Sequence, residues 1–255
     1  MTVWITGDIH SNPFRLSTDS FYEQKTFEGG YENNIVIQCG DFGIVWCNEE
    51  SKEEKYKLDW LNSKNFTTVF VDGNHDNIPR LDSYPIKEWC GGLVNEIRPR
   101  VLRLRRGEVY TIAGHKFFAF GGASSHDISD GILDINDPNI NQQIKQMKYE
   151  GKYMYRIKGF TYWTEELPSK EEMQNGISNL EKHNWQVDYI ITHSPPASVI
   201  ALLGHGFYEQ DILTKYLEEI RCKLDFKRHF MGHMHVNKAV NDRDIILYEQ
   251  IIRII

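Results

Sequence analysis

Four short apolar runs along the chain each end in a cluster of polar residues. The runs cover residues 3–6, 34–39, 67–71 and 187–192. Continuous apolar runs of this length predict strands that are buried on both faces, as in a parallel sheet. Ligand-binding groups gather at the carboxyl ends of such strands, so the polar residues that follow the runs are candidates for a site.

Three polar segments carry apolar residues at helical spacing and predict helices over residues 48–62, 169–185 and 211–222. The second segment follows Pro168 and opens with a capping box of Ser169 and Glu172, which is a helix start signal. Strands that alternate with helices predict an α/β fold.

Two stretches depart from this alternation. Residues 100–122 form short runs around Gly107 and Gly114, and these predict antiparallel hairpins. From about residue 125 to 168 the periodicity fades, which predicts an irregular insertion over the sheet edge that carries the polar clusters. We therefore expect a single domain over residues 1–255 with one insertion.

Composition and charge exclude several classes of protein. The chain has 255 residues, of which 40% are hydrophobic and 25% charged, so it is not disordered, collagen-like or a coiled coil. The formal net charge of −7 argues against a generic nucleic-acid-binding patch and against an anionic membrane surface. The one basic run contains Arg103 and Arg105 alternating with leucines, which predicts the solvated face of a strand.

The cysteines and the N-terminal residues indicate a cytoplasmic protein. Cys39, Cys47, Cys90 and Cys222 are scattered without a Cys-x-x-Cys pair, which argues against a disulfide framework and a thiolate zinc site. The first residues have no basic start, and no apolar run is long enough to span a bilayer.

The polar clusters consist of residue types that bind metals or transfer protons. They are Asp8, His10, Asp41, Asn74, His75, His193, His233 and His235. Residues two apart in an extended segment point the same way, so Asp-x-His and His-x-His suit one site. Each residue alone would be read as a turn, a cap, a core histidine or a surface histidine. The ordered set favours a metal site.

These clusters resemble the five sequence blocks of the calcineurin-like metallophosphoesterase superfamily, in the same order. The blocks are Asp8-Ile9-His10, Gly40-Asp41, Gly73-Asn74-His75-Asp76, His193 and Gly232-His233-Met234-His235. The resemblance spans residues 7–235. Within the superfamily, the chain resembles the stand-alone bacterial or phage type of phosphoesterase. It implies the α/β metallophosphoesterase fold, a central β-sandwich flanked by helices, with the insertion over the active-site edge.

The resemblance also implies a dinuclear metal centre. One ion would be held by Asp8, His10, Asp41 and His235, and the other by Asp41, Asn74, His193 and His233. Asp41 would bridge the two ions, because a carboxylate has lone pairs enough for both. The ions would be divalent, with Mn²⁺ as the first expectation and Fe, Zn, Co or Ni as alternatives. A hydroxide that bridges them would attack phosphorus.

The remaining candidates concern proton transfer and substrate binding. The resemblance makes His75 the group that protonates or stabilises the leaving oxygen, with Asp76 orienting its ring and raising its pKa. His126 and Trp163 are substrate-binding candidates, and the alternative for Trp163 is a packing cluster that pins the insertion to the sheet. We expect the remaining histidines to be surface or structural residues: His115, His183, His205 and His229.

The expected substrate is a phosphate ester, with a preference for phosphodiesters or nucleotides. The arginines that grip phosphate in protein phosphatases of this superfamily are absent from residues 40–46 and from the residues before Asn74. A phosphomonoesterase or protein phosphatase is the alternative within the class. A non-catalytic metal-binding interaction module on the same scaffold is the alternative from another class, and the intact His75 argues against it. The sequence leaves the oligomeric state open.

Overall fold

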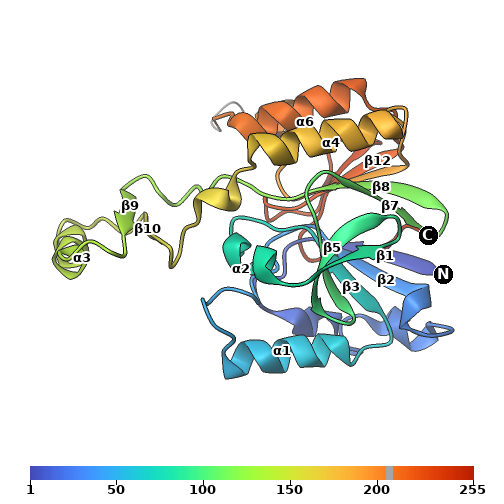
Figure 1. Ribbon diagram of the computed structural model, residues 1–255, viewed down its shortest axis with the longest axis horizontal. Coiled ribbons are helices and arrows are strands. Elements are labelled where there is room, and N and C mark those ends of the chain that lie inside the picture. Colours follow the sequence, from blue (N-terminus) through green and yellow to red (C-terminus); the bar gives the residue numbers. More distant parts are fainter. Residues whose placement is uncertain (205–208) are drawn as a thin grey trace.

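Two β-sheets lie face to face at the centre of the molecule (Figure 1). The computed structural model describes residues 1–204 and 209–255. The first sheet has the strand order β15-β1-β2-β3-β6-β5-β4. Its strands in chain order are β1 (Thr2–Thr6), β2 (Asn34–Gln38), β3 (Thr67–Phe70), β4 (Ile86–Trp89), β5 (Gly92–Arg98), β6 (Val101–Leu104) and β15 (Ile251–Arg253). The strands β1, β2, β3 and β6 are parallel to one another.

The second sheet has the order β13-β14-β12-β11-β8-β7. Its strands are β7 (Glu108–Ile112), β8 (His115–Phe120), β11 (Tyr189–Thr192), β12 (Arg228–Met231), β13 (Lys238–Ala239) and β14 (Asp244–Ile246). The strands β8, β11, β12 and β14 are parallel. Both sheets therefore present several parallel carboxyl ends, where the polar clusters follow.

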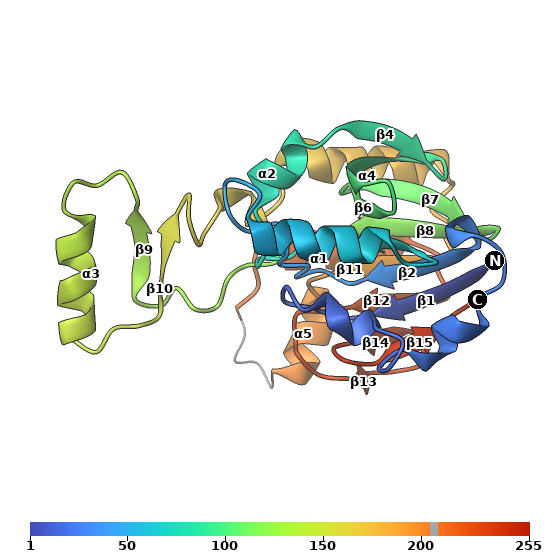
Figure 2. The same ribbon diagram turned by 90° about the horizontal axis from the view of Figure 1, so that it is seen from below.

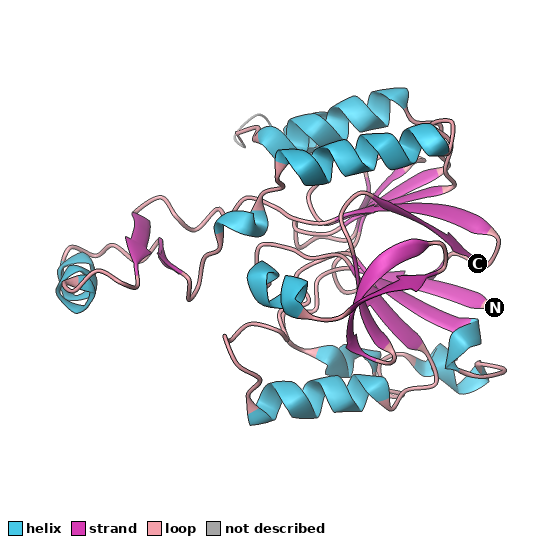
Figure 3. Ribbon diagram, viewed as in Figure 1, coloured by secondary structure: helices cyan, strands magenta, loops and turns pink. Residues whose placement is uncertain are grey.

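Helices cover the outer faces of both sheets (Figure 3). The α-helices of the body are α1 (Lys52–Asn62), α2 (Ile78–Ser83), α4 (Lys170–Lys182), α5 (Ala197–Leu203) and α6 (Ile212–Lys223), and short 3₁₀ turns are η1 (Pro13–Leu16), η2 (Tyr22–Thr26), η3 (Tyr31–Asn33) and η4 (Thr164–Glu166). Leu58 and Leu61 of α1 pack on the first sheet, whereas Leu213 and Leu217 of α6 pack on the second. The expected β-sandwich flanked by helices is confirmed.

The insertion is ordered and projects away from the body, as Figure 2 shows. It contains β9 (Gly131–Asp134), α3 (Ile140–Tyr149) and β10 (Tyr155–Lys158), and β9 pairs with β10 in parallel. We call residues 126–162 the arm. The expectation of an irregular segment is therefore wrong for this part, because short β-strands bracket an amphipathic helix whose pattern is too short to stand out in the sequence.

One predicted hairpin is wrong. Gly114 does lie in the turn that joins β7 to β8, which pair in antiparallel fashion. Gly107, however, lies between β6 of the first sheet and β7 of the second, so it marks a crossing between sheets. Gly107 has a φ of +80°, and a Cβ there would lie 2.6 Å from the backbone nitrogen of Gly176 in α4, so both the turn between the sheets and the close approach of α4 favour a glycine.

The predicted solvated arginine face is also wrong. Arg103 and Arg106 are 1% and 3% exposed, and both bind the buried carboxylate of Asp72, with Nε–O distances of 2.9 and 3.0 Å. Burial would raise the pKa of Asp72, but the two guanidinium groups lower it to about 2. The strand β6 lies between β3 and β5, and its Arg103 faces the interior and needs a buried counter-charge, whereas Arg105 is only partly buried.

All four cysteines are free, and Cys39 is buried. In the part of the chain that the structure describes, no helix combines the length and the apolar character needed to cross a bilayer. His229 is buried and shares a 2.8 Å hydrogen bond with Thr192, which is a structural role, whereas His205 lies outside the described residues.

Candidate metal centre

Loops at the carboxyl ends of strands from both sheets bring the ordered polar residues to one place. Four of them offer ligand atoms that all lie within 4.8 Å of one another: Asp8, His10, Asp41 and His235. The Nε2 atoms of His10 and His235 are 2.9 Å apart, and Nε2 of His235 lies 3.3 Å from Oδ2 of Asp8. These are the residues that the sequence resemblance assigns to the first ion.

The residues assigned to the second ion lie around the other oxygen of Asp41. Nε2 of His193 is 3.2 Å from Oδ1 of Asp41, and the rings of His193 and His233 have centroids 4.9 Å apart. Nδ1 of His193 donates to the carbonyl of Cys39 at 2.8 Å, so the lone pair of the neutral ring lies on Nε2.

One buried atom of this second group lacks a partner among the described residues. It is Oδ1 of Asn74, in a side chain that is almost fully buried. A buried acceptor without a partner costs free energy, and a cation removes that cost. The donor set of carboxylate, amide oxygen and imidazole nitrogen therefore fits a divalent metal ion.

Glycines make room for these side chains. A Cβ at Gly73 would lie 2.1 Å from Oδ1 of Asp41, and one at Gly232 would lie 2.2 Å from Oδ1 of Asp8. A Cβ at Gly40 would lie 2.2 Å from Nδ1 of His193. These three glycines are therefore needed for the close approach of the candidate ligands.

The two carboxylates also tie the loops together. Both oxygens of Asp8 accept the backbone N–H of His233 at 3.1 Å, which links the loop after β1 to the loop after β12. Oδ1 of Asp41 accepts the backbone N–H of His75 at 2.8 Å. These bonds join four loops in two pairs.

The electrostatics of the cluster are those of a cation site. Burial lowers the pKa of His193, but the carboxylates of Asp41 and Asp8 outweigh it and raise that pKa to about 10. Burial would likewise raise the pKa of Asp41, but the neighbouring His193 lowers it. Without metal, a proton on His193 takes the place of a cation, so metal binding releases it.

The family match agrees with this geometry. The family model described as calcineurin-like phosphoesterase matches residues 1–237. The chain belongs to the calcineurin-like phosphoesterase family. It is a metal-dependent phosphoric ester hydrolase, and the sequence resemblance is confirmed.

Other comparisons add less. A crystal structure of phosphopantetheinyl hydrolase from Mycobacterium tuberculosis is similar at 14% identity and a TM-score of 0.45, covering 97% of this chain and 88% of that chain. A likeness at this level carries no argument about substrate. Among the curated proteins none matches the chain.

His75 of this phosphoesterase is held by groups that the sequence did not indicate. Nη2 of Arg156, in the arm, donates to Nε2 of His75 at 3.1 Å, and the ring of Trp46 stacks over His75 at 6.0 Å with an interplanar angle of 24°. Burial, followed by the charge of Arg156, lowers the pKa of His75. The ring is therefore neutral near pH 7.

The expected action of Asp76 on His75 is not what the structure shows. The carboxylate of Asp76 is buried and accepts the backbone N–H groups of Phe42, Gly43 and Gly73 at 3.2, 2.7 and 2.9 Å. Asp76 thus ties the Gly40-Asp41 loop to the Gly73-Asn74 loop. The residue after the histidine is a backbone anchor, because neighbouring side chains in a turn point apart.

The two substrate-binding candidates occupy different settings. Nε2 of His126 lies 2.7 Å from Nε2 of His233, so His126 does border the metal centre. Trp163 is only 5% exposed and packs edge-on against Trp46, with ring centroids 4.9 Å apart. This position matches the packing alternative for Trp163, which braces Trp46 and through it His75.

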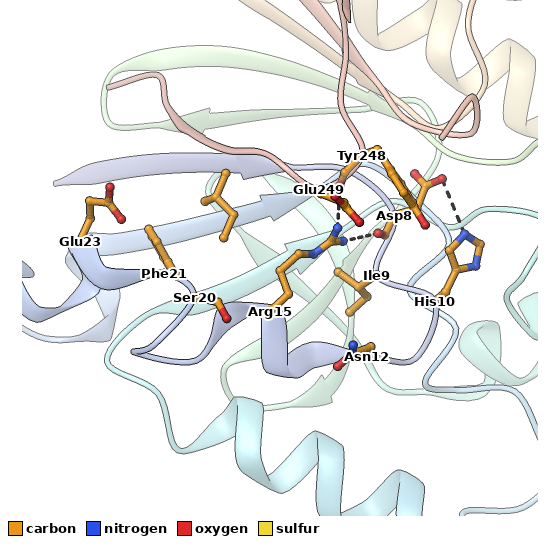
Figure 4. Close-up of a pocket in the computed structure, with 11 residues that line it drawn as sticks. Asp8, Ile9, His10, Asn12, Arg15, Ser20, Phe21, Glu23, Tyr248 and Glu249 are labelled. Carbon is orange, nitrogen blue, oxygen red and sulfur yellow. Dashed lines mark hydrogen bonds and ion pairs between the residues drawn. The ribbon is translucent and has the colours of Figure 1, made fainter. Parts of the chain in front are cut away.

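Two cavities adjoin the phosphoesterase centre. The first has a volume of about 630 Å³ and reaches Asp8 and His10 (Figure 4). Arg15 spans it and donates to the carbonyl groups of Tyr248 at 2.8 Å and of Asp8. The second has a volume of about 600 Å³ and is lined by His126 and His233, among others.

Proposed function

We propose that the protein hydrolyses phosphate esters with two divalent metal ions, and that its substrates are phosphodiesters or nucleotides. The second ion is supported by the unpartnered buried Oδ1 of Asn74 and by Nε2 of His193, which lies 3.2 Å from Oδ1 of Asp41. Asp41 contacts both groups and is the candidate bridge.

The ions, when bound, lower the pKa of a shared water and stabilise charge on the phosphoryl oxygens. The chain supplies the rest. The carboxylates of Asp8 and Asp41 hold the loops, and Nδ1 of His193 is fixed on Cys39. His75 is neutral, and its Nε2 accepts from Arg156, so its proton lies on Nδ1. That N–H is the donor we assign to the leaving oxygen.

The two cavities support the preference for phosphodiesters. A diester carries two organic groups and a monoester carries one. One cavity borders the first group at Asp8 and His10, and the other borders the second at His233. Each lies within the usual volume range of small-molecule sites. Both organic groups of a diester therefore have room beside the centre.

A mixture of oxygen and imidazole ligands accepts several divalent metals, so the metal bound depends on which ions are available. We propose Mn²⁺ first, with Fe, Zn, Co or Ni as alternatives. The four free cysteines are compatible with the reducing cytoplasm proposed from the sequence.

The test is hydrolysis of a matched chromogenic phosphate diester and monoester by metal-stripped protein, before and after Mn²⁺ is added. We expect turnover only with metal and a higher kcat/KM for the diester. His75→Ala should lose turnover by about 10²-fold or more, as for removal of a positioned proton donor. Metal-independent turnover would contradict the proposal, and a higher kcat/KM for the monoester would overturn the diester preference.

A further inference from the structure

Two side chains of the arm reach the metal centre, His126 beside His233 and Arg156 beside His75. Of residues 126–162, only Arg156 is buried, with 4% exposure, whereas the apolar side chains of α3 are all partly or fully exposed. Arginine is seldom fully buried unless its charge is used. The buried contact between the arm and the body is therefore made by a positively charged side chain.

The guanidinium group of Arg156 is held on several sides. Nε lies 2.6 Å from Oδ1 of Asp127, and Nη1 donates to the carbonyl oxygens of Asn74 and Thr161, both at 3.2 Å. Nη2 donates to Nε2 of His75 at 3.1 Å. Three of these four partners are neutral, and one is the backbone of a candidate metal ligand.

The Nη2 atom has capacity for another acceptor. It carries two N–H groups, and among the described residues the one partner recorded for it is the neutral ring nitrogen of His75. A phosphate oxygen is a stronger acceptor for guanidinium than a neutral imidazole nitrogen, because the bond is charge-assisted. His75 is itself tied to Asp41 through its backbone N–H, so this donor lies next to the metal centre.

We propose that Arg156 binds a phosphoryl oxygen of the substrate beside His75, so that the arm completes the substrate site. The proposal rests on the proposed phosphoesterase function and deepens it. The Gly40-Asp41 and Gly73-Asn74 blocks contain no arginine for this purpose, and Arg156 supplies one from a segment 81 residues away from His75. The arm then supplies the side chain that binds the phosphate group of the substrate.

The experiment measures binding of inorganic phosphate to Mn²⁺-loaded, full-length protein by calorimetry, with metal content determined in parallel. Arg156→Gln should weaken phosphate binding at least about tenfold, and Arg156→Lys should weaken it several-fold, because lysine keeps the charge but loses the fork. Metal content should stay at the wild-type value. This readout does not require turnover, so it separates failure of this proposal from failure of the proposed function.

Two controls isolate the guanidinium group from arm structure. Lys158→Gln removes a positive charge from the same strand at an exposed position. Gln143→Ala removes the 2.8 Å hydrogen bond from Nε2 of Gln143 to Oδ2 of Asp137, which loosens the start of α3 but involves none of the partners of Arg156. Both variants should bind phosphate within about twofold of wild type.

Unchanged phosphate binding in Arg156→Gln, at equal metal content, would overturn the proposal and leave Arg156 as a positioning residue for His75. An equal loss in Gln143→Ala would also overturn it, because arm structure alone would then explain the effect. If Arg156→Gln does not fold, Arg156→Lys decides in the same way.

Discussion

At the scale of single residues, four candidate ligands adopt a backbone conformation that residues other than glycine rarely adopt. The φ angles are 44° at His10, 50° at Asp41, 67° at His233 and 48° at His235. Such residues cost about 1–3 kcal/mol each and persist where the surroundings fix them. Three of the four belong to the group whose ligand atoms lie within 4.8 Å. The strained backbone at these residues therefore directs their side chains toward the same point.

Gly73→Ala tests how tightly the ligands are packed. The new Cβ would lie 2.1 Å from Oδ1 of Asp41 and 2.5 Å from its backbone nitrogen, so Asp41 must move. We expect loss of bound metal and a fall of about 1–3 kcal/mol in the free energy of unfolding. Metal analysis and urea unfolding measure both. Gly30→Ala is the control, because its Cβ meets only the flexible end of Glu32, and it should keep its metal.

Asp41→Ala and His75→Ala separate ligand from proton donor. Asp41 contacts His10 of one group and His193 of the other, at 3.7 and 3.2 Å, so its removal should abolish binding of both ions. His75→Ala should retain two ions and lose turnover. Metal content by mass spectrometry decides, and equal metal loss in the two variants would contradict the assignment of His75.

What the sequence could predict at this scale follows from where partners lie in the chain. The candidate ligands stand in short blocks, so each block could be recognised by itself. Arg156 has no such block, and its contact with His75 joins residues 81 positions apart. The pairing of Asp72 with Arg103 and Arg106 is likewise long-range, so the arginines resembled an exposed strand face.

At the scale of elements, Asp72 fastens the end of β3 to β6. Asp72→Asn should lower the free energy of unfolding by about 3 kcal/mol, because Arg103 and Arg106 then keep only the more exposed carboxylates of Asp82 and Glu172 as charged partners. Urea unfolding measures this. Lys55→Gln removes an ion pair with Asp59 whose side chains are 62% and 48% exposed, and we expect no measurable change. Equal effects would refute the role of burial.

Glu166 fastens the two ends of the insertion to each other. Its carboxyl group accepts the backbone N–H and the hydroxyl of Ser125 at 2.8 and 2.6 Å, with Arg156 and Asp127 nearby. Burial raises the pKa of Glu166 from 4.5 to about 7. The folded state thus holds a proton that the unfolded chain releases, so stability falls as the pH rises through this window.

The wild-type protein should lose on the order of 2 kcal/mol of this contribution between pH 4.5 and 7. Glu166→Gln has no proton to lose, so its stability should depend less on pH in that window. Thermal unfolding at a series of pH values measures the difference. The neighbouring exposed Glu165→Gln should follow the wild-type curve, and a Glu166→Gln curve parallel to wild type would contradict the linkage.

Local signals explain which elements were predictable. The capping boxes of Ser169 and Asp211 mark the starts of α4 and α6, and both helices begin at the next residue. The sequence did not predict the hairpin of β4 and β5. Its turn contains Cys90 and Gly91, and its strands alternate only weakly between apolar and polar residues. The crossing at Gly107 depends on packing against α4, which no local pattern encodes.

At the scale of the whole molecule, the arm stands apart from a compact body (Figure 2). Limited digestion with trypsin should cut first at exposed lysines of α3, such as Lys145 and Lys148. The two fragments should elute together, because each sheet contains strands from both sides of the cut. Mass spectrometry and size-exclusion chromatography test this, and a first cut within α1 or α6 would contradict it.

The pairing of β1 with β15 sets the order in which this molecule can be completed. The first strand lies between β2 and the last strand, and the backbone N–H of Ile254 donates to the carbonyl of Val3 at 2.9 Å. During synthesis, the loop that carries Asp8 and His10 therefore waits for residues from the far end of the chain, including His233 and His235. Contacts of such high sequence separation make folding slow and late. The centre therefore assembles only after the residues up to Ile254 have left the ribosome.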